Sequence, residues 1–296
     1  MIASDLLSLL RCPTCRGELV LEAGRNAPEV PSTVDEEGVL RCTTCGERYP
    51  TRRGFPVLFP AQTLHRPEWV QWNDHLEKFQ ARRDSRVQNP ERPINRIAER
   101  SQPQPSFGRF VGIEEGAVLD VGCGPGKFRF QLDPQKVRYV GLDPIALPDV
   151  GEFPFVQGLA EYMPFRDGSF TDVVVLAALD HFRDLDQFLS ETARVLTAGG
   201  RLHIMQSVHE VRGPVSAVKV MAHKIKDALE DRVSARHGSD VPKHLSEFTS
   251  RALVERMASS FDVVSTDTYS ATWYSPEKLF LTFRPKSDVP SLAHPA

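Results

Sequence analysis

The chain has 296 residues, which allows about two domains, and its formal net charge of −3 gives no general attraction to nucleic acid. Hydrophobic residues make up 41% and charged residues 25%, which is ordinary for a globular protein. No apolar run approaches the roughly 18–20 residues of a membrane span, and no basic region followed by an apolar one opens the chain, so we expect a cytoplasmic protein without a signal peptide.

Four of the five cysteines form two Cys-x-x-Cys pairs, Cys12 with Cys15 and Cys42 with Cys45. Each pair can form a tight turn that presents two thiolates, and two such turns complete a tetrahedral zinc site. The alternative is a set of reducible thiols without metal, which the matched spacing disfavours. Because four cysteine ligands leave no open coordination position, we expect a structural zinc ion that supplies much of the folding energy of a small domain at residues 1–60.

The residues around the cysteines resemble a known family. Residues 6–13, 41–50 and 54–58 are similar to the Trm112-like zinc-ribbon family. Small proteins of that family serve elsewhere as partners of methyltransferases. The resemblance implies that such a module is fused here to its enzyme.

Residues 61–106 connect this module to the rest of the chain. A helix is predicted at residues 68–83, and its apolar stripe consists of Trp69, Trp72, Leu76 and Phe79. We favour the interpretation that the stripe packs on the following domain, with a lid over a substrate site as the alternative. Residues 89–105 contain four prolines and are expected to be an irregular linker.

A short strand that runs into a glycine-rich turn organises the remainder of the chain. Residues 118–121 are β-prone, and Gly122, Gly124 and Gly126 follow them. Glycine tolerates positive φ and lets a ligand touch the main chain. A buried strand, a glycine turn and a helix are how α/β proteins bring their backbone close to a nucleotide-like ligand. The spacing of the glycines alone is weak evidence.

Later segments add weight to this interpretation. Residues 139–143 read as a second strand that ends at Asp143, whose carboxylate can accept hydrogen bonds from both hydroxyls of a ribose. Residues 160–170, the apolar run 173–176 and residues 196–204 follow in order. The alternation of strands and helices predicts a mostly parallel sheet.

With these segments together, residues 107–286 resemble a class I S-adenosylmethionine (SAM)-dependent methyltransferase of the methyltransferase 11 type. The resemblance implies an α/β fold with a Rossmann-like sheet of seven strands and helices on both faces, in addition to the small zinc-ribbon domain.

The resemblance also implies a set of cofactor-binding residues. These are Asp120, Gly122, Cys123, Gly124, Gly126, Asp143, Pro144, Leu159, Ala160, Leu176 and Ala177. Asp120 would lie near the amino group of SAM, and Asp143 would accept the ribose hydroxyls. Cys123 reads as a packing residue rather than a nucleophile. Leu159 stands where family members often carry an aspartate that holds the adenine amino group, so backbone groups or Glu161 would have to replace that contact.

Methyl transfer asks the protein mainly to orient donor and acceptor. A hydroxyl or amine acceptor must also lose a proton, and histidine is the side chain that most often accepts it. Asp180 and His181 follow the fourth strand at the sheet edge where substrates bind. His181 is therefore the leading candidate base with Asp180 beside it, and a structural histidine is the alternative. His203 is expected to be structural, and His209 is a minor candidate.

The last third of the chain contains the remaining elements. Asp184 is expected to cap a helix that ends at Gly199 and Gly200. A helical insertion is expected at about residues 208–245, and residues 212–243 hold seven Lys or Arg against four Asp or Glu, a local charge of +3. A solvated face is the favoured reading of this charge, and an acidic substrate or RNA is the alternative. The expected order then ends with a helix at 249–259, strands at 261–264 and 279–283, and a flexible tail at 287–296.

Three functions remain open. The residues after the fourth strand, 177–182, lack the Asn/Asp-Pro-Pro-Tyr/Phe motif of enzymes that methylate amide or adenine nitrogens. They favour methylation of an oxygen or nitrogen of a small biosynthetic intermediate, such as a metabolite, sugar or lipid precursor. One alternative is an RNA methyltransferase, because some rRNA guanine methyltransferases carry an N-terminal zinc module. Another is a non-catalytic SAM-binding scaffold, which the intact Asp120 and Asp143 disfavour. The oligomeric state stays open, a homodimer included.

Overall fold

The computed structural model describes part of the chain. The described residues are 2, 4–22, 36–60, 66–67, 69–70, 72, 103–145, 153–208, 218, 221, 225, 248–270 and 277–287. Several sequence expectations therefore lie outside it, among them those for Leu76, Phe79, His209, most of the insertion and the C-terminal tail. No helix of the described residues is long and apolar enough to cross a membrane.

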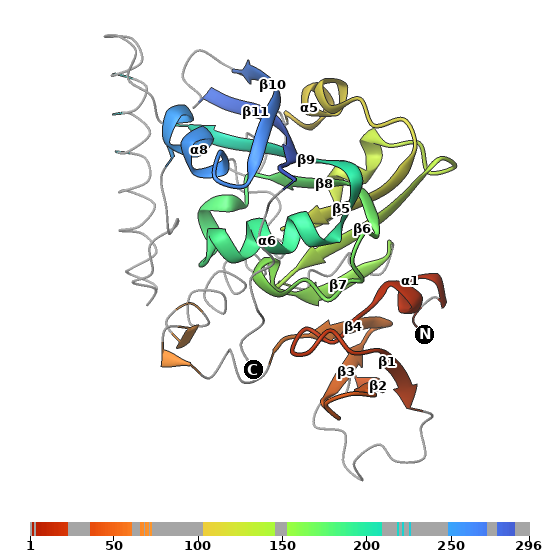
Figure 1. Cartoon of the computed structure of the whole chain (residues 1–296). Coiled ribbons are helices and arrows are strands. Elements are labelled where there is room, and N and C mark those ends of the chain that lie inside the picture. Colours follow the sequence, from red (N-terminus) through yellow and green to blue (C-terminus); the bar gives the residue numbers. More distant parts are fainter. Residues whose placement is uncertain are drawn as a thin grey trace.

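One continuous sheet runs through the described residues in the order β1-β2-β3-β4-β7-β6-β5-β8-β9-β11-β10 (Figure 1). Its second part holds β5 (Gly116–Val121), β6 (Val137–Asp143), β7 (Phe155–Gly158), β8 (Phe170–Leu176), β9 (Leu196–Val208), β10 (Phe261–Tyr269) and β11 (Glu277–Pro285). Strands β7, β6, β5, β8 and β9 are parallel, and β11 is antiparallel to both β9 and β10. This confirms the predicted α/β sheet of seven strands, and four strands of the N-terminal module lengthen it to eleven.

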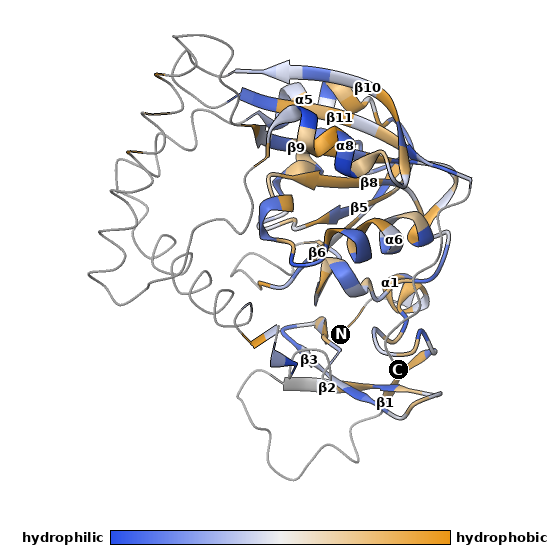
Figure 2. Cartoon of the chain, turned by 60° about the vertical axis from the view of Figure 1, so that its left-hand side comes forward, coloured by the Kyte–Doolittle hydropathy of each residue, from blue (hydrophilic) through white to orange (hydrophobic). Residues whose placement is uncertain are grey.

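The central strands form because their residues are apolar on both sides. In β5 every residue from Ala117 to Val121 is buried, and β8 is buried over most of its length. Strands of a parallel sheet are covered on both faces, so they read as continuous apolar runs rather than as alternating ones. Figure 2 shows β8 as a mainly hydrophobic strand in the middle of the sheet.

Helices cover both faces of the sheet. Helices α6 (Leu185–Val195) and α8 (Ser250–Met257) contribute Phe188 and Leu253 to the apolar core on one face. Helix α5 (Gln104–Val111) contributes Phe107 to the core on the other. Caps fix where α6 and α8 begin, because Asp184 accepts a hydrogen bond from the Gln187 amide and Thr249 from the Ala252 amide.

Two expected boundaries are wrong. Helix α6 ends at Val195 and the chain turns extended at Leu196, so Gly199 and Gly200 lie within β9 instead of ending the helix. Helix α5 begins at Gln104, inside the segment expected to be an irregular linker. Proline is tolerated in the first turn of a helix because its missing N–H would have no partner there, so Pro105 does not prevent this start.

The N-terminal module is a short helix and four antiparallel strands. They are α1 (Ser4–Leu9), β1 (Leu19–Glu22), β2 (Glu36–Cys42), β3 (Arg48–Arg52) and β4 (Phe55–Leu58). The four paired cysteines lie in two turns, one after α1 and one after β2. Figure 1 shows the module beyond β7, at the opposite end of the sheet from β10.

The module is joined to the sheet by backbone pairing and by a shared core. Strand β4 pairs with β7 in parallel, with Val57 opposite Gln157 and Leu58 opposite Gly158. Residues 9–11 pair with residues 164–166, because the Arg11 amide donates to the Pro164 carbonyl and the Arg166 amide to the Leu9 carbonyl. Leucines of α1 belong to the same apolar core as β5. The module is too small to build an apolar core alone, and it shares the core of the larger sheet instead.

Candidate functional site

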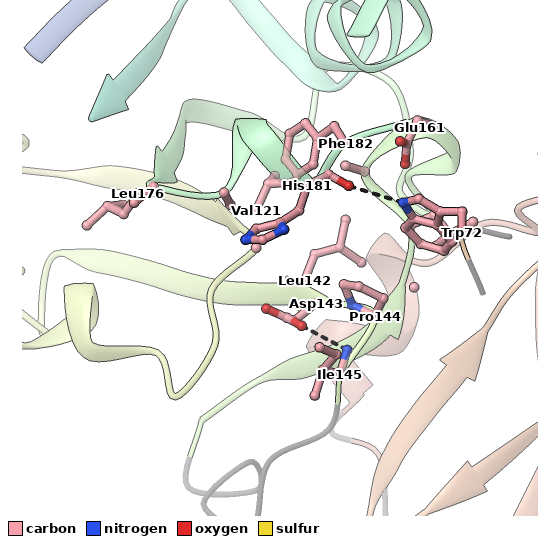
Figure 3. Close-up of a pocket in the computed structure, with 16 residues that line it drawn as sticks. Trp72, Val121, Leu142, Asp143, Pro144, Ile145, Glu161, Leu176, His181 and Phe182 are labelled. Atoms are coloured by element: carbon pink, nitrogen blue, oxygen red, sulfur yellow. Dashed lines mark hydrogen bonds between the residues drawn. The ribbon is translucent and has the colours of Figure 1, made fainter. Parts of the chain in front are cut away.

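A pocket opens at the carboxyl ends of β5, β6 and β8, where ligands bind in open α/β sheets. Its volume is about 750 Å³, counting the part open to solvent. The predicted site residues that line it are Gly122, Asp143, Pro144, Leu159, Ala160, Leu176, Ala177 and His181 (Figure 3). Residues from four separate segments of the chain thus meet in one pocket, as the order of the motifs predicts.

The other predicted residues lie behind the pocket wall. Cys123 is buried with its sulfur against the backbone of Gly141, where an added Cβ would lie 2.7 Å from it. Gly126 packs against the ring of Phe153, and the Gly124 amide donates to Asp143. Cys123 thus packs in the core, as the sequence indicates.

The turn after β5 requires glycine at its first position. Gly122 has a φ of 70°, and an added Cβ would lie 2.5 Å from the Cβ of Ala178. Ala177 also has a positive φ of 53°, which is uncommon for a residue with a side chain. Its amide donates to the Met205 carbonyl at 2.7 Å. The residues that follow β5 and β8 thus both have a positive φ, and they pack against each other beside the pocket. Such unusual backbone conformations are typical of functional sites.

Asp143 holds the glycine turn in place from the end of β6. One carboxylate oxygen accepts the Gly124 amide at 2.8 Å, and the other accepts the Ile145 amide at 2.8 Å. The carboxylate also lines the pocket, where a ligand can reach it. Figure 3 shows this side chain at the pocket, opposite His181.

Asp120 carries a buried carboxyl beneath the glycine turn. Its Oδ2 accepts a hydrogen bond of 2.7 Å from the Tyr139 hydroxyl, and its Oδ1 has no hydrogen-bond partner among the described residues. Burial raises the pKa of Asp120 from 3.8 to about 7, the charge of Asp143 adds to the rise, and the Tyr139 hydrogen bond opposes it. An acceptor oxygen without a donor fits a cationic group of a ligand.

Replacing Asp120 by asparagine is expected to stabilise the ligand-free protein at neutral pH. The folded pKa lies above the unfolded one, so the folded state binds more protons and wild-type stability falls as pH rises from about 4 to about 7. The Asp120→Asn variant has no carboxyl group at this position, so it does not lose stability in this way. Its free energy of unfolding should therefore exceed that of wild type by an amount that grows between about pH 4 and pH 7 to about 1–4 kcal/mol.

Urea unfolding of both proteins between about pH 4 and pH 8 measures this difference. Glu114→Gln, at an exposed carboxylate, is the matched control and should show no such trend. An Asp120→Asn advantage that does not change with pH would contradict the raised pKa.

An aromatic residue of the connecting segment, Trp72, forms part of the pocket wall. Trp72 lines the pocket, and its indole N–H donates to the carbonyl of His181 at 3.1 Å. Trp69 packs edge-on against Trp72 and contacts Tyr162, and Leu159 completes this cluster. The two tryptophans of the stripe therefore pack on the domain, and Trp72 also lines the pocket, while Leu76 and Phe79 lie outside the described residues. Helical spacing alone could not show which of its residues faces a ligand.

Glu161 is a second buried carboxyl, held in a 3-10 helix at Ala160–Tyr162. It lines the pocket, and its Oε1 accepts the amides of Arg183 at 2.7 Å and of Asp184 at 3.3 Å. Burial raises the pKa of Glu161 to about 7, while the Arg183 amide opposes the rise. These two hydrogen bonds thus connect the part of the pocket wall that contains Leu159 to the residues just before α6.

His181 ends a 3-10 helix at Leu179–His181, and Figure 3 shows its imidazole pointing into the pocket. Asp180 is buried beside it but does not line the pocket. The chain thus brings a proton acceptor to the same space as Asp143 and Leu176.

His203 has a structural role, as expected. It is fully buried, with Nε2 2.8 Å from Asp172 and Nδ1 2.9 Å from the Thr282 hydroxyl. Burial lowers the pKa of His203 despite the aspartate. The neutral ring therefore donates to Asp172 and accepts from Thr282, which links β8, β9 and β11.

The four paired cysteines form a compact cluster with metal-binding geometry. Their sulfur atoms all lie within 4.8 Å of one another. Cys12 and Cys45 are 3.7 Å apart at sulfur, and Cys15 and Cys42 are 3.4 Å apart. A tetrahedral zinc ion with Zn–S bonds of about 2.3 Å spaces its ligands by about 3.8 Å, so the cluster fits such an ion with little adjustment.

Two family models match this chain. The model described as a methyltransferase domain matches residues 119–204, and the model of Trm112p-like proteins matches residues 4–54. The two matches lie in the C-terminal sheet and in the N-terminal module, respectively.

Curated relatives share the methyltransferase domain. An uncharacterized methyltransferase of Mycobacterium tuberculosis is 32% identical over 154 residues, which cover 48% of this chain and 63% of the relative. The ubiquinone/menaquinone biosynthesis C-methyltransferase of Escherichia coli is 28% identical over 176 residues, which cover 60% of this chain and 63% of that protein. The chain thus spans less than two thirds of the length of these relatives.

Solved structures support the fold of the methyltransferase domain. The 1,6-didemethyltoxoflavin-N1-methyltransferase of Burkholderia thailandensis has a TM-score of 0.52 at 17% identity, covering 73% of this chain and 90% of that one. A complex of the Haloferax volcanii Trm112 methyltransferase activator with a methyltransferase gives a TM-score of 0.51 at 17% identity, covering 69% and 97%. At these identities the likeness concerns the fold alone.

Proposed function

We propose that this protein is a SAM-dependent methyltransferase that methylates a small biosynthetic intermediate. The observation that carries the proposal is the pocket at the ends of β5, β6 and β8, where Gly122, Asp143 and His181 meet. The match to the methyltransferase family model over residues 119–204 supports the same reaction class.

The residues of the pocket fit the three parts of SAM. Asp143 lines the pocket, where its carboxylate would accept hydrogen bonds from the ribose hydroxyls. The Oδ1 of Asp120, which has no partner among the described residues, suits the ammonium group of the methionine part. Leu159 and Trp72 offer apolar surface to the adenine ring. When bound, SAM supplies a methyl group already activated on a sulfonium sulfur. The protein therefore has to position an acceptor and manage its proton.

The acceptor would lie between Leu176, Phe182 and His181. These side chains all line the pocket. Two apolar walls favour an acceptor with an apolar ring, and His181 would accept the proton that its reacting group loses. The relative from Escherichia coli is described as a C-methyltransferase. We extend the proposal to carbon as well as oxygen and nitrogen acceptors.

An RNA acceptor is the second candidate. The N-terminal cysteine module keeps it open, because some rRNA guanine methyltransferases carry an N-terminal zinc module. The net charge of −3 gives no electrostatic support, because RNA-binding surfaces are strongly basic. We rank a small-molecule acceptor first for this reason.

We also propose that the cysteine cluster binds a structural zinc ion. All four ligands are thiols and the cluster lies in the N-terminal module, apart from the pocket. No open ligand position would remain for a substrate.

Transfer of a labelled methyl group from SAM tests the proposal. We expect the wild-type protein to label a member of a panel of phenols, quinols, amines and sugars, and to bind SAM and its product S-adenosylhomocysteine in calorimetric titrations. In His181→Gln the rate constant kcat should fall about 100-fold or more because glutamine cannot accept the proton, while SAM affinity should change less than about threefold.

The outcomes separate the alternatives. No binding of either compound by the folded protein would contradict a SAM-dependent enzyme. Labelling of RNA alone, with a strong dependence on salt, would support the second candidate. A His181→Gln variant that loses SAM affinity and thermal stability along with its rate would assign a structural role to His181.

A further inference from the structure

Tyr49 brings a hydroxyl group into contact with the cysteine cluster from the interior of the protein. It lies in β3, shortly after Cys45, and pairs with Leu40 of β2. Tyr49 is only 3% exposed, and its hydroxyl oxygen lies 3.1 Å from the sulfur of Cys12. The hydroxyl oxygen of Thr14 lies 3.2 Å from the Tyr49 hydroxyl on another side. The polar atom of a buried tyrosine thus meets the cluster directly.

The two buried cysteines of the cluster, Cys12 and Cys42, each have a hydrogen-bond donor at their sulfur. The Cys45 amide donates to the sulfur of Cys42 at 3.5 Å, within the second cysteine turn. For Cys12 the donor is the Tyr49 hydroxyl. A buried thiolate needs such donors, because removing a negative charge from water costs free energy unless hydrogen bonds replace the lost hydration.

The direction of these hydrogen bonds follows from the chemistry of a metal ligand. A metal-bound thiolate carries no proton, so Cys12 can only accept and Tyr49 must donate. The oxygen of Tyr49 then serves as an acceptor, and the Thr14 hydroxyl donates to it. A chain of two hydrogen bonds therefore runs from Thr14 through Tyr49 to Cys12. Four thiolates around one Zn²⁺ leave a net negative charge, which a donor at one of the sulfur atoms stabilises.

The ring of Tyr49 is fixed by the core that the N-terminal module shares with the larger sheet. Tyr49 belongs to the same apolar cluster as Leu10, Leu40 and Phe165. Leu10 and Phe165 are also joined by an antiparallel bridge between the module and the segment after β7. Packing of the ring thus holds the hydroxyl at the cysteine cluster. A donor that is held in place loses little conformational entropy when a metal binds.

We propose that Tyr49 is a positioning residue of the zinc site, whose hydroxyl donates to the metal-bound thiolate of Cys12 and is itself oriented by Thr14. This inference rests on the zinc site proposed above and deepens it, because it assigns part of the metal affinity to residues that are not ligands. Hydrogen-bond partners of metal ligands typically contribute about 10- to 100-fold to metal affinity. Through its ring, Tyr49 also connects metal binding to the core that the two parts of the chain share.

Competition for zinc between the full-length protein and a chromophoric chelator of known affinity measures this contribution. In Tyr49→Phe, which keeps the ring and removes only the hydroxyl, the dissociation constant for zinc should rise about 10- to 100-fold. In Thr14→Val it should rise about two- to fivefold, because the lost hydrogen bond acts on the thiolate only through Tyr49. Tyr269→Phe is the matched control. Tyr269 ends β10, at the opposite end of the sheet from the cysteine cluster, so its zinc affinity should equal that of wild type.

The spectrum of the cobalt-substituted protein separates hydrogen bonding from packing. Co²⁺ binds thiolate sites of this kind, and its thiolate-to-metal charge-transfer band reports the energy of the sulfur electrons. A hydrogen bond to the sulfur lowers that energy, so the band should move to longer wavelength in Tyr49→Phe at saturating cobalt. A role of Tyr49 in packing alone would lower the affinity and leave the band of the saturated protein in place.

The outcomes distinguish this inference from the proposal on which it rests. Wild-type protein that binds neither zinc nor cobalt would overturn the zinc site itself. Tight zinc binding by wild type with an unchanged dissociation constant in Tyr49→Phe would overturn only the inference, and so would a cobalt band that does not move. If thermal unfolding shows that Tyr49→Phe does not fold, Thr14→Val decides, and an unchanged zinc dissociation constant in that variant overturns the inference.

Discussion

Replacing Cys42 by serine is expected to unfold the N-terminal module and to weaken SAM binding at least tenfold. Loss of one thiolate from the cluster should release the proposed zinc ion. Structural zinc sites contribute about 10–16 kcal/mol to the folding of small domains, which is comparable to the whole stability of a domain. Strand β4 would then leave β7, whose end leads into Leu159 on the pocket wall.

Three measurements check this result. Metal analysis should find about one zinc per wild-type chain and much less in Cys42→Ser, thermal unfolding should show a lower midpoint, and calorimetry should show the weaker binding. Thr43→Ala, at an exposed position of the same turn, is the control and should match wild type. Less than half an equivalent of zinc in freshly purified wild-type protein would exclude the four-cysteine site.

Replacing Arg194 by methionine is expected to cost about 3–5 kcal/mol of stability, the loss typical of breaking a buried ion pair by removing one partner. Arg194 is almost fully buried and donates to Glu191 and to the carbonyls of Met163 and Phe165 at 2.6 to 2.8 Å. Without it, the carboxylate of Glu191 stays fully buried and loses its 2.7 Å ion pair, while Arg16 of the N-terminal module lies 3.0 Å from it. Both carbonyls would also lose the arginine as a donor, although that of Met163 would keep the Phe165 amide.

Urea unfolding measures this loss as a lower midpoint with an unchanged slope. Arg251→Met provides a matched control, because Arg251 also pairs with a glutamate, Glu255, but is exposed. Its midpoint should stay close to wild type, since surface ion pairs contribute little. Equal effects of the two substitutions would mean that the Arg194 network does not stabilise the fold.

The elements that the sequence predicts well are those encoded by neighbouring residues. Asp184 precedes an apolar pattern of helical period, and it caps α6 as expected. The glycines after β5 and the carboxylate at the end of β6 follow apolar runs, and the sheet places both at one edge. Local sequence patterns are enough to predict these positions, because the carboxyl ends of all strands in a parallel sheet lie at the same edge.

The features that the sequence does not predict depend on contacts between distant segments. Nothing near Val57 indicates that it pairs with Gln157, one hundred positions later. Similarly, Trp72 looks like any other member of an apolar stripe until its indole is seen at the carbonyl of His181. The end of α6 was misplaced because a glycine pair is a typical helix stop, whereas here the strand begins at Leu196 and contains that pair.

The pairing of β4 with β7 also has a consequence for how the two parts of the protein stay together. Because both strands belong to one chain, their association is intramolecular, with an effective concentration set by the connecting segment. Dilution cannot separate them, unlike two subunits that bind each other from solution. Each methyltransferase domain therefore keeps its own Trm112-like domain on dilution, and a competing protein would have to exceed that effective concentration to displace it.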